Sequence, residues 1–452
     1  MASADATGLL DLEPFSSTEV GRKRWAALAA RLASRPFLRS EGVNASLAVP
    51  TRAAPWLVEQ SRELVRRFDH FYRLIVDAKG SLAEEPAVQI GEPYQRIAAL
   101  EPSSPPLPLS RFDCVLEPDG TLKVIELNPI GVCTLHLRSA AYLAHALRST
   151  QTQDPALERA ASAIDELSVM KTRSIRRFAD ANTGRKMRNI GIVLLPNMHR
   201  GSVLFWRREL ADAGFTVTVG RPQQLQIVGD EARLDGRPID ALWVDWVAYL
   251  GFQQQRYEQT RFASRAGDFS TASSVTEAML SLPGLTAMLQ DRRLTLVSPL
   301  RGYRALSKGL LAWIDRPELP LSDEERRYLR KHTARTFDHR ARTDGGLSLE
   351  RARQERASLV LKPCRFGGSH GVVLGRDLDD EAWTRRLDAI WTDPEWVLQS
   401  FADPISDAAG ARLSYGLYNY AGELGGLLVR SANELVISAR TASTIIAVIG
   451  ES

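Results

Sequence analysis

The sequence predicts an α+β protein of more than one domain, and three observations support this fold class. Its 452 residues suffice for two or three domains with a large core. In the N-terminal region, apolar residues recur at spacings of three and four, as in amphipathic helices. In the C-terminal part, short apolar runs alternate with glycine, proline and aspartate, which is typical of strands joined by turns.

Charge and cysteine content argue against several classes of protein. The chain has 58 basic and 54 acidic residues, and the two kinds are interspersed, as in SDEERRYLRK. A nucleic-acid-binding protein would concentrate positive charge in one patch, so we expect no nucleic-acid partner. No secretory leader and no apolar run of roughly 18 residues is present, so we expect no membrane segment. Three cysteines without a CxxC pair predict neither a disulfide framework nor a structural zinc site, which fits a cytoplasmic protein.

The first half of the chain begins with helices and continues with a hairpin. RKRWAALAARLASR and APWLVEQSRELVRRFDHFYRLIVDA carry apolar stripes, so residues 1–95 are predicted to form a mainly helical region. The proline-rich stretch 102–109 is a predicted connector. RFDCVLEP and LKVIELNP predict two strands, joined by Asp119-Gly120, which is a strong hairpin signal. An apolar stripe over 154–180 predicts a long helix.

The second half combines a small parallel sheet with further strands. RNIGIVLLP, FTVTVG and DALWVDW are strand-like, and the amphipathic LFWRRELADAG separates the first two, which favours a βαβ unit. No GxGxxG is present, which argues against a dinucleotide site there. A helical, charged stretch follows over 295–340. The segments SLVLKP, VVLG, WVLQSF, RLSYGLYNY and GGLLVR then predict strands, with EAWTRRLDAIW as a helix.

The stretch KVIELNPIG carries two potential metal ligands. Residues i and i+2 of a strand point to the same face, so Glu126 and Asn128 project side by side. Asp113 lies on the preceding strand of the predicted hairpin and shares a face with Arg111. Hard cations such as Mg²⁺ take oxygen ligands and complete their shell with waters and substrate phosphates. The alternative is that this Glu and Asn bond to loop backbone at a strand end.

A glycine-rich loop and a later strand suggest a nucleotide. LVLKPCRFGGSHGVVLG places Lys362 before Gly367, Gly368 and Gly371. Glycine-rich turns let backbone N–H groups approach phosphate oxygens, and a nearby lysine adds positive charge. The Walker pattern GxxxxGK[ST] is absent, so a hairpin loop with a surface lysine is the alternative. WVLQSF, with Gln399, is a strand end of the kind that can hold an adenine ring.

Together these motifs resemble the nucleotide site of the ATP-grasp superfamily. In most of its enzymes the Glu-x-Asn strand follows the adenine strand, whereas IELNP here precedes LKP by some 230 residues. That order resembles the circularly permuted ATP-grasp group, which includes glutathionylspermidine synthetase and the eukaryotic-type glutathione synthetase. RFD and ELN are similar to the metal site of glutathionylspermidine synthetase, and LSKGLLAWI is similar to the helix whose lysine reaches the nucleotide phosphates. The resemblance covers roughly residues 105–150 and 188–452.

The resemblance implies a role for each matching residue. It implies that Mg²⁺ is bound by Asp113, Glu126 and Asn128, and that Arg111 contacts the transferring phosphate. The candidates for nucleotide binding are Lys308, Lys362, Gly367, Gly368, Ser369, His370, Gly371, Gln399 and Phe401. The candidates for phosphate or substrate carboxylate are Arg412 and Arg430. The candidates for substrate recognition are Cys133, Thr134, His199, Arg200 and Ser202. Packing or solvent exposure is the alternative for the loop residues.

The resemblance also implies a domain organisation and a reaction. We expect a helical N-terminal region over 1–95 and the first part of a circularly permuted ATP-grasp domain over 96–185. A small α/β (pre-ATP-grasp-like) domain follows over 186–295, on the substrate side, and the nucleotide-binding part covers 296–452. The implied activity is ATP- and Mg²⁺-dependent ligation of a carboxylate and an amine, small molecules or peptides, into an amide through an acyl phosphate. A non-catalytic nucleotide-binding module and a small-molecule kinase are the alternatives.

Overall fold

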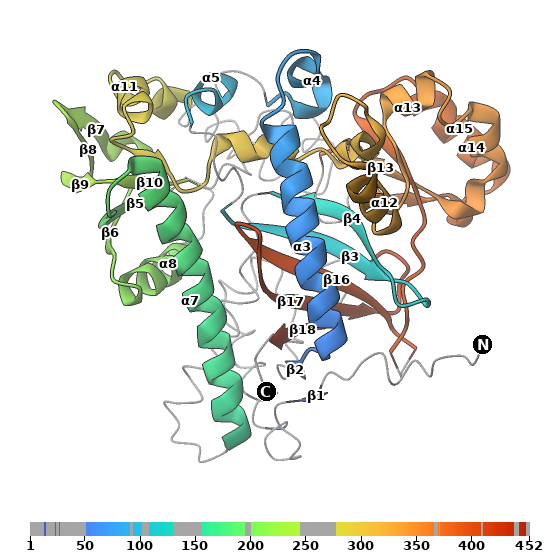
Figure 1. The fold of residues 1–452 in the computed structure, drawn as a ribbon, viewed down its shortest axis with the longest axis horizontal. Helices are drawn as coiled ribbons and strands as arrows, with labels where there is room; N and C mark the ends of the chain where they lie inside the picture. Colours follow the sequence, from blue (N-terminus) through green and yellow to red (C-terminus); the bar gives the residue numbers. More distant parts are fainter. Residues whose placement is uncertain are drawn as a thin grey trace.

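The computed structural model describes the parts of the chain from which the fold and the candidate site are built. They are residues 13–14, 23, 27, 51–90, 94–101, 108–129, 155–194, 200–244, 277–365, 369, 371–407, 410–437 and 443–448. Helices and strands are mixed along these residues, as the α+β prediction requires. Figure 1 shows a central sheet, with a smaller sheet and its helices on either side. None of the helices in the described segments is long and apolar enough to cross a membrane.

The central sheet joins strands that lie far apart in the sequence. Its order is β1-β2-β18-β17-β16-β3-β4, and all neighbours are antiparallel except β18 and β2. The strands are β1 (Glu13–Pro14), β2 (Thr51–Arg52), β3 (Ser110–Leu116), β4 (Leu122–Asn128), β16 (Arg412–Tyr420), β17 (Glu423–Ala432) and β18 (Ser443–Val448). Gly120 has φ +82° in the turn between β3 and β4, which confirms the predicted hairpin.

Helix α3 (Pro55–Val76) covers the apolar face of this sheet, as Figure 1 shows. Its amphipathic stripe buries Phe68 and Tyr72, whose rings lie 5.8 and 6.0 Å from that of Phe112 on β3. Leu417 and Val429 complete the same core from β16 and β17. Because side chains of a strand alternate between faces, the opposite face of β3 and β4 is left for polar residues. The short elements α4 (Ser81–Glu84), η2 (Pro86–Val88) and α5 (Tyr94–Ala98) follow α3.

The middle region forms the parallel sheet that the sequence predicts. Its order is β11-β10-β5-β6, and the strands are β5 (Asn189–Val193), β6 (Thr216–Gly220), β10 (Ala241–Trp243) and β11 (Thr295–Leu296). Helices α7 (Pro155–Thr183), α8 (Arg200–Asp212) and α11 (Leu285–Gln290) belong to this region, with η3 (Pro222–Gln224). An antiparallel sheet of β7 (Leu225–Val228), β8 (Glu231–Leu234) and β9 (Arg237–Ile239) was not expected from the sequence.

The C-terminal region contains a second antiparallel sheet of order β12-β15-β13-β14. The strands are β12 (Thr336–Phe337), β13 (Leu359–Pro363), β14 (Val373–Leu374) and β15 (Trp396–Ser400). One face packs Leu361 and Leu398 against Trp383 and Leu387 of α15. The helices are α12 (Asp323–Lys331), α13 (His339–Thr343), α14 (Leu349–Gln354) and α15 (Asp380–Ile390), with η9 (Arg356–Ser358) and η10 (Gly375–Asp377).

The predicted helical stretch 295–340 is only partly correct. It holds η7 (Leu300–Ala305) and η8 (Lys308–Asp315), which are 3₁₀-helices, and the α-helix α12. Pro299 and Ser307 precede the two 3₁₀-helices in extended conformation, so neither helix can lengthen backwards. After α12 the chain is extended because its backbone bonds to the edge of β4: Val124 N donates to His332 O (2.8 Å) and Ala334 N donates to Val124 O (3.2 Å).

The carboxyl group of Glu101 caps the N-terminus of η7. It accepts hydrogen bonds from the backbone N–H groups of Leu300 (2.8 Å) and Arg301 (2.7 Å). Burial raises the pKa of Glu101 to about 8, although these two hydrogen bonds act in the opposite direction. Glu101 therefore keeps its proton in the folded protein at pH values at which the unfolded chain has lost it.

This pKa predicts a stability that decreases as pH rises. Between about pH 5 and 8 the unfolded state binds one proton fewer at this position, so the free energy of unfolding falls by on the order of 1 kcal/mol per pH unit. We expect Glu101→Gln to flatten the dependence of the unfolding midpoint on pH in this window. Glu350→Gln, at an exposed position of α14, is the control. Equal slopes for Glu101→Gln and the wild type would contradict the prediction.

Candidate functional site

The polar face of the β3–β4 hairpin brings the four motif residues together. Arg111 is paired with Asn128 and Asp113 with Glu126, so all four side chains lie on one face. A β-bulge follows, because the register shifts between Asp113 and Cys114, which is paired with Val124. Val124 is thereby returned to the apolar core, although it lies two residues before Glu126. The arrangement predicted from RFD and ELN is therefore present on these strands.

Arg111 and Asp113 form a bidentate ion pair. Arg111 Nε donates to Asp113 Oδ1 (2.5 Å) and Arg111 Nη2 donates to Asp113 Oδ2 (2.9 Å). Burial opposes ionisation of Asp113, but the charge and hydrogen bonds of Arg111, with smaller contributions from Arg430 and Asn128, lower its pKa below the ordinary value. The absence of a side chain at Gly416 makes room for Arg111, since a Cβ there would lie 2.8 Å from Arg111 Cδ.

Two further arginines lie on the neighbouring strands of the same face. Arg430 on β17 places Nη1 3.9 Å from Asp113 Oδ2, so it approaches the carboxylate that Arg111 holds. Arg412 begins β16, and its register puts it on the same face as Arg430. Its Nη1 donates to Asn433 O (3.1 Å), so the guanidinium is directed along the sheet and not toward Asp113. The structure thus brings Arg430, and not Arg412, to the metal-ligand candidates.

Lys308 provides the cation for Glu126. Its Nζ lies 3.3 Å from Glu126 Oε1, and the lysine is buried. Two contacts fix the start of η8: the backbone N–H of Lys308 donates to Cys364 O (2.9 Å), and Ser307 Oγ accepts from Gly309 N (3.2 Å). Lys308 is therefore connected through its main chain to the end of β13 and through its side chain to β4.

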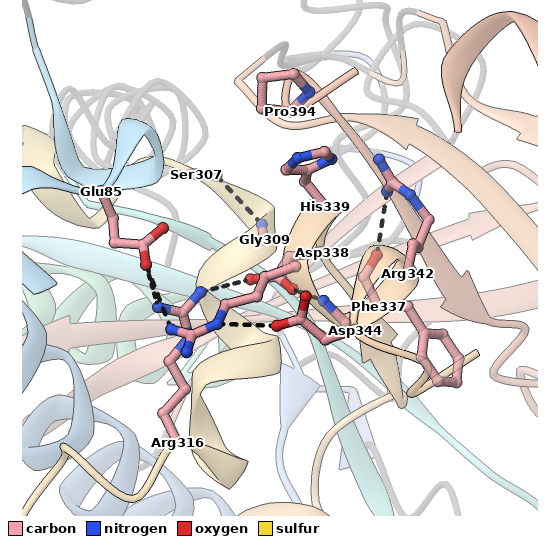
Figure 2. A network of polar contacts seen from close by, with 12 residues as sticks. Glu85, Ser307, Gly309, Arg316, Phe337, Asp338, His339, Arg342, Asp344 and Pro394 are labelled. Carbon is pink, nitrogen blue, oxygen red and sulfur yellow. Dashed lines mark hydrogen bonds and ion pairs between the residues drawn. The ribbon is translucent and has the colours of Figure 1, made fainter. Parts of the chain in front are cut away.

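The far end of η8 is held by Arg316, as Figure 2 shows. Its guanidinium pairs with Glu85 Oε1 (2.8 Å), just before η2, and with Asp338 Oδ2 (3.1 Å), which caps α13. The same guanidinium lies 4.3 Å from the ring centroid of Trp313, a fully buried residue. This network connects the end of η8 with the segment before η2 and with the start of α13, which follows β12.

The C-terminal sheet, of order β12-β15-β13-β14, presents Lys362 of β13 and Gln399 of β15 on one face. Lys362 Nζ donates to Gln399 Oε1 (2.5 Å). Gln399 Nε2 in turn donates to Thr336 Oγ1 (2.9 Å) and to Ile125 O on β4 (3.4 Å). Burial lowers the pKa of Lys362 to about 8; Glu126 and Asp113 oppose this shift, and Lys308 adds to it. The lysine thus lies within the electrostatic field of the two carboxylates on the other sheet.

The residues present fit a hard divalent cation. Asp113 and Glu126 supply carboxylate oxygens and Asn128 an amide oxygen, which is the donor chemistry that Mg²⁺ requires. Both carboxylates are paired with cations, Arg111 and Lys308. In the described part of the chain no three His, Cys, Asp or Glu side chains gather into a metal cluster, so a set of three ligands here would have to include the Asn128 amide oxygen.

The other candidate residues are placed less fully. Gly367, Gly368, His370, Cys133, Thr134 and His199 lie outside the described residues. Ser369 and Gly371 both have positive φ, +63° and +71°, in the loop before β14. Arg200 and Ser202 lie in the first turn of α8. Phe401 follows β15, with the guanidinium of Arg376 3.9 Å from its ring centroid.

Three residues that connect the site were not predicted from the sequence: Glu85, Arg316 and Thr336. None of them belongs to a recognisable motif. Glu85 pairs with Arg316, which lies 231 residues later, and Thr336 accepts a hydrogen bond from Gln399, which lies 63 residues later. Such contacts can be seen only in the tertiary structure.

No protein-family model and no curated protein matches the sequence. Among the solved structures that align with this chain are the following two. A glutathione synthetase-like effector from Globodera pallida aligns over 96% of this chain and 98% of its own, at 10% identity and a TM-score of 0.49. A protein from Methylobacillus flagellatus, provisionally named a gamma-glutamylcysteine synthetase, aligns over 87% of each chain, at 11% identity and a TM-score of 0.40.

Gly416 provides a test of the packing around Arg111. We expect Gly416→Ala to displace the Arg111 side chain, because the new Cβ would lie 2.8 Å from Arg111 Cδ. It could not move away from Arg111, since it would also lie 3.3 Å from Leu428 Cβ. The expected cost is about 1–3 kcal/mol in the free energy of unfolding, measured by chemical denaturation. Ser414→Ala, two residues earlier on the same face of β16, is the matched control. The same denaturation midpoint for Gly416→Ala and Ser414→Ala would show that the packing of the Arg111 side chain does not require a glycine at position 416.

Proposed function

We propose that the protein is an ATP- and Mg²⁺-dependent carboxylate–amine ligase that forms an amide bond through an acyl phosphate, with release of ADP and phosphate. One observation supports this most: three oxygen-bearing side chains on β3 and β4 are surrounded by four basic side chains from separate elements. The basic residues are Arg111, Arg430, Lys308 and Lys362. Such an arrangement suits a reaction that spreads negative charge over phosphoryl oxygens.

Each group has a defined task in this proposal. Asp113, Glu126 and Asn128 would hold Mg²⁺, which neutralises phosphate charge when bound. Lys308 and Lys362 would hold phosphate oxygens from the side of the β12-β15-β13-β14 sheet. Arg111 and Arg430 would hold them from the side of the central sheet. No nucleophile of the protein is required, because positioning and charge neutralisation supply the catalysis. The substrate carboxylate attacks the γ-phosphorus, ADP leaves, and the amine then displaces phosphate from the acyl carbon.

The chain order supports the permuted form of the fold that we propose. The strands with the metal-ligand candidates, β3 and β4, precede the lysine-bearing strand β13 in the sequence. Strand β3 nevertheless pairs with β16, which follows β13, within one sheet, and β4 joins that sheet through β3. We further propose that the acid or amine substrate is recognised near Arg200 and Ser202 at the start of α8, after the parallel strand β5, because ligands of such sheets bind at the carboxyl ends of strands.

Phosphate release tests the proposed activity. The purified protein and Glu126→Ala would be incubated with ATP, Mg²⁺ and pairs drawn from amino acids, short peptides and polyamines. We expect ADP formation that depends on both an acid and an amine, and a rate reduced on the order of 10²–10³-fold in Glu126→Ala. ADP formation with one acceptor and a phosphorylated product would indicate a kinase. A wild-type protein that does not bind ATP would refute the proposal.

The pKa of Lys362 predicts the pH dependence of nucleotide binding. Because the pKa is about 8, the ammonium loses its charge as pH rises through 8, and with it the attraction for phosphate. We expect ATP affinity, measured by calorimetry, to decrease between pH 7 and 9. Lys362→Arg keeps its charge over this range, so its affinity should change less. Parallel pH profiles for the two proteins would show that another group governs the dependence.

A further inference from the structure

A chain of hydrogen bonds runs from the edge of β4 to Lys362. Ala334 N donates to Val124 O (3.2 Å), and Thr336 Oγ1 donates to Ala334 O (2.8 Å). Gln399 Nε2 donates to Thr336 Oγ1 (2.9 Å), and Lys362 Nζ donates to Gln399 Oε1 (2.5 Å). Thr336 and Gln399 are buried, and their strands pair directly at these two residues.

The backbone carbonyl of Ala334 determines which group donates and which accepts in the hydrogen bonds that follow it, from Thr336 to Lys362. A carbonyl oxygen can only accept, so the hydroxyl proton of Thr336 points to it. The hydroxyl oxygen then has only lone pairs for Gln399, which must present its NH₂ group on that side. The carboxamide oxygen of Gln399 is consequently turned toward Lys362. A carboxamide without such a neighbour could rotate by half a turn and present two N–H donors to the ammonium, which would repel it.

A second acceptor gives the Gln399 carboxamide the same orientation. Its Nε2 also donates to Ile125 O (3.4 Å). Ile125 lies at the bulge, where the register of β4 against β3 shifts, and directly precedes Glu126. The carboxamide therefore connects the lysine of one sheet with the strand of the metal-ligand candidates in the other.

We propose that Thr336 is a positioning residue: its hydroxyl orients the Gln399 carboxamide, which directs the Lys362 ammonium to the ATP phosphates. This inference rests on the proposed function. It also assigns Gln399 a task other than the adenine contact expected from WVLQSF. The side chain of Gln399 holds a lysine, and an adenine ring would have to use the strand's backbone.

Thr333 offers a matched control in the same segment. It is buried like Thr336, yet within the described part of the chain its hydroxyl has no hydrogen-bond partner. Thr333→Val and Thr336→Val thus make the same chemical change three residues apart. Only the second removes the shorter of the two hydrogen bonds that Gln399 Nε2 donates, the one to Thr336 Oγ1.

The experiment measures the affinities of the wild type and both variants for ATP·Mg²⁺ and for adenosine. We expect Thr336→Val to weaken ATP binding about tenfold, because a hydrogen bond to a charged group becomes misdirected. Adenosine binding should stay within about twofold of the wild type, because adenosine has no phosphate for Lys362. Thr333→Val should bind both ligands like the wild type, and Thr336→Ser, which restores the hydroxyl, should restore ATP affinity.

Three results would overturn the inference. One is wild-type ATP affinity in Thr336→Val; another is an equal loss of ATP and adenosine binding, as expected of a general structural defect; the third is no recovery in Thr336→Ser. If Thr336→Val does not fold, Gln399→Glu provides the test, since its carboxylate would neutralise Lys362 and should weaken ATP binding but not adenosine binding. Absence of ATP binding by the wild type would refute the proposed function itself, so the two failures are distinguishable.

Discussion

The candidate site depends on the register of β3 against β4. Strict alternation would send Val124 to the same face as Glu126 and Asn128, and an apolar side chain would lie beside the carboxylates. The bulge between Asp113 and Cys114 removes this conflict: Val124 joins the core under α3, while Glu126 and Asn128 stay opposite Asp113 and Arg111. One irregularity in a seven-residue strand thus separates an apolar face from a charged one.

Buried charge is then balanced across two sheets. Arg111 and Arg430 approach Asp113 from the first sheet, and Lys308 reaches Glu126 from a 3₁₀-helix attached to the second. Because removing a charge from water is costly, each of these groups needs a partner of opposite sign. Lys362 has only a neutral partner at hydrogen-bond distance among its described contacts, which is why burial dominates its pKa. A ligand rich in negative charge would complete the balance.

Much of the fold could be predicted from local patterns, whereas the links within the site could not. The period of two in LKVIELN indicates that Glu126 and Asn128 share a face, and Asp119-Gly120 indicates the hairpin. Neither pattern reveals the bulge, because it depends on how the two strands pair. The same limit applies to Thr336, Arg316 and Glu85: their roles come from partners distant in sequence, and a single hydroxyl or guanidinium leaves no periodic signal. Whether the glycine loop contacts phosphate stays a prediction.

The pairing of β3 with β16 has a consequence for synthesis of the chain. About 280 residues separate the end of β4 at Asn128 from the start of β16 at Arg412. At 5–20 residues per second a ribosome needs roughly 15–60 s to make that stretch. During this interval neither β16 nor Arg430 of β17 has been synthesised, so the edge of β3 that pairs with β16 has no partner. An unpaired edge of this kind recruits other strands. The edge of β3 is therefore made long before its partner strand, and the site cannot form until β16 and β17 have been added to the sheet.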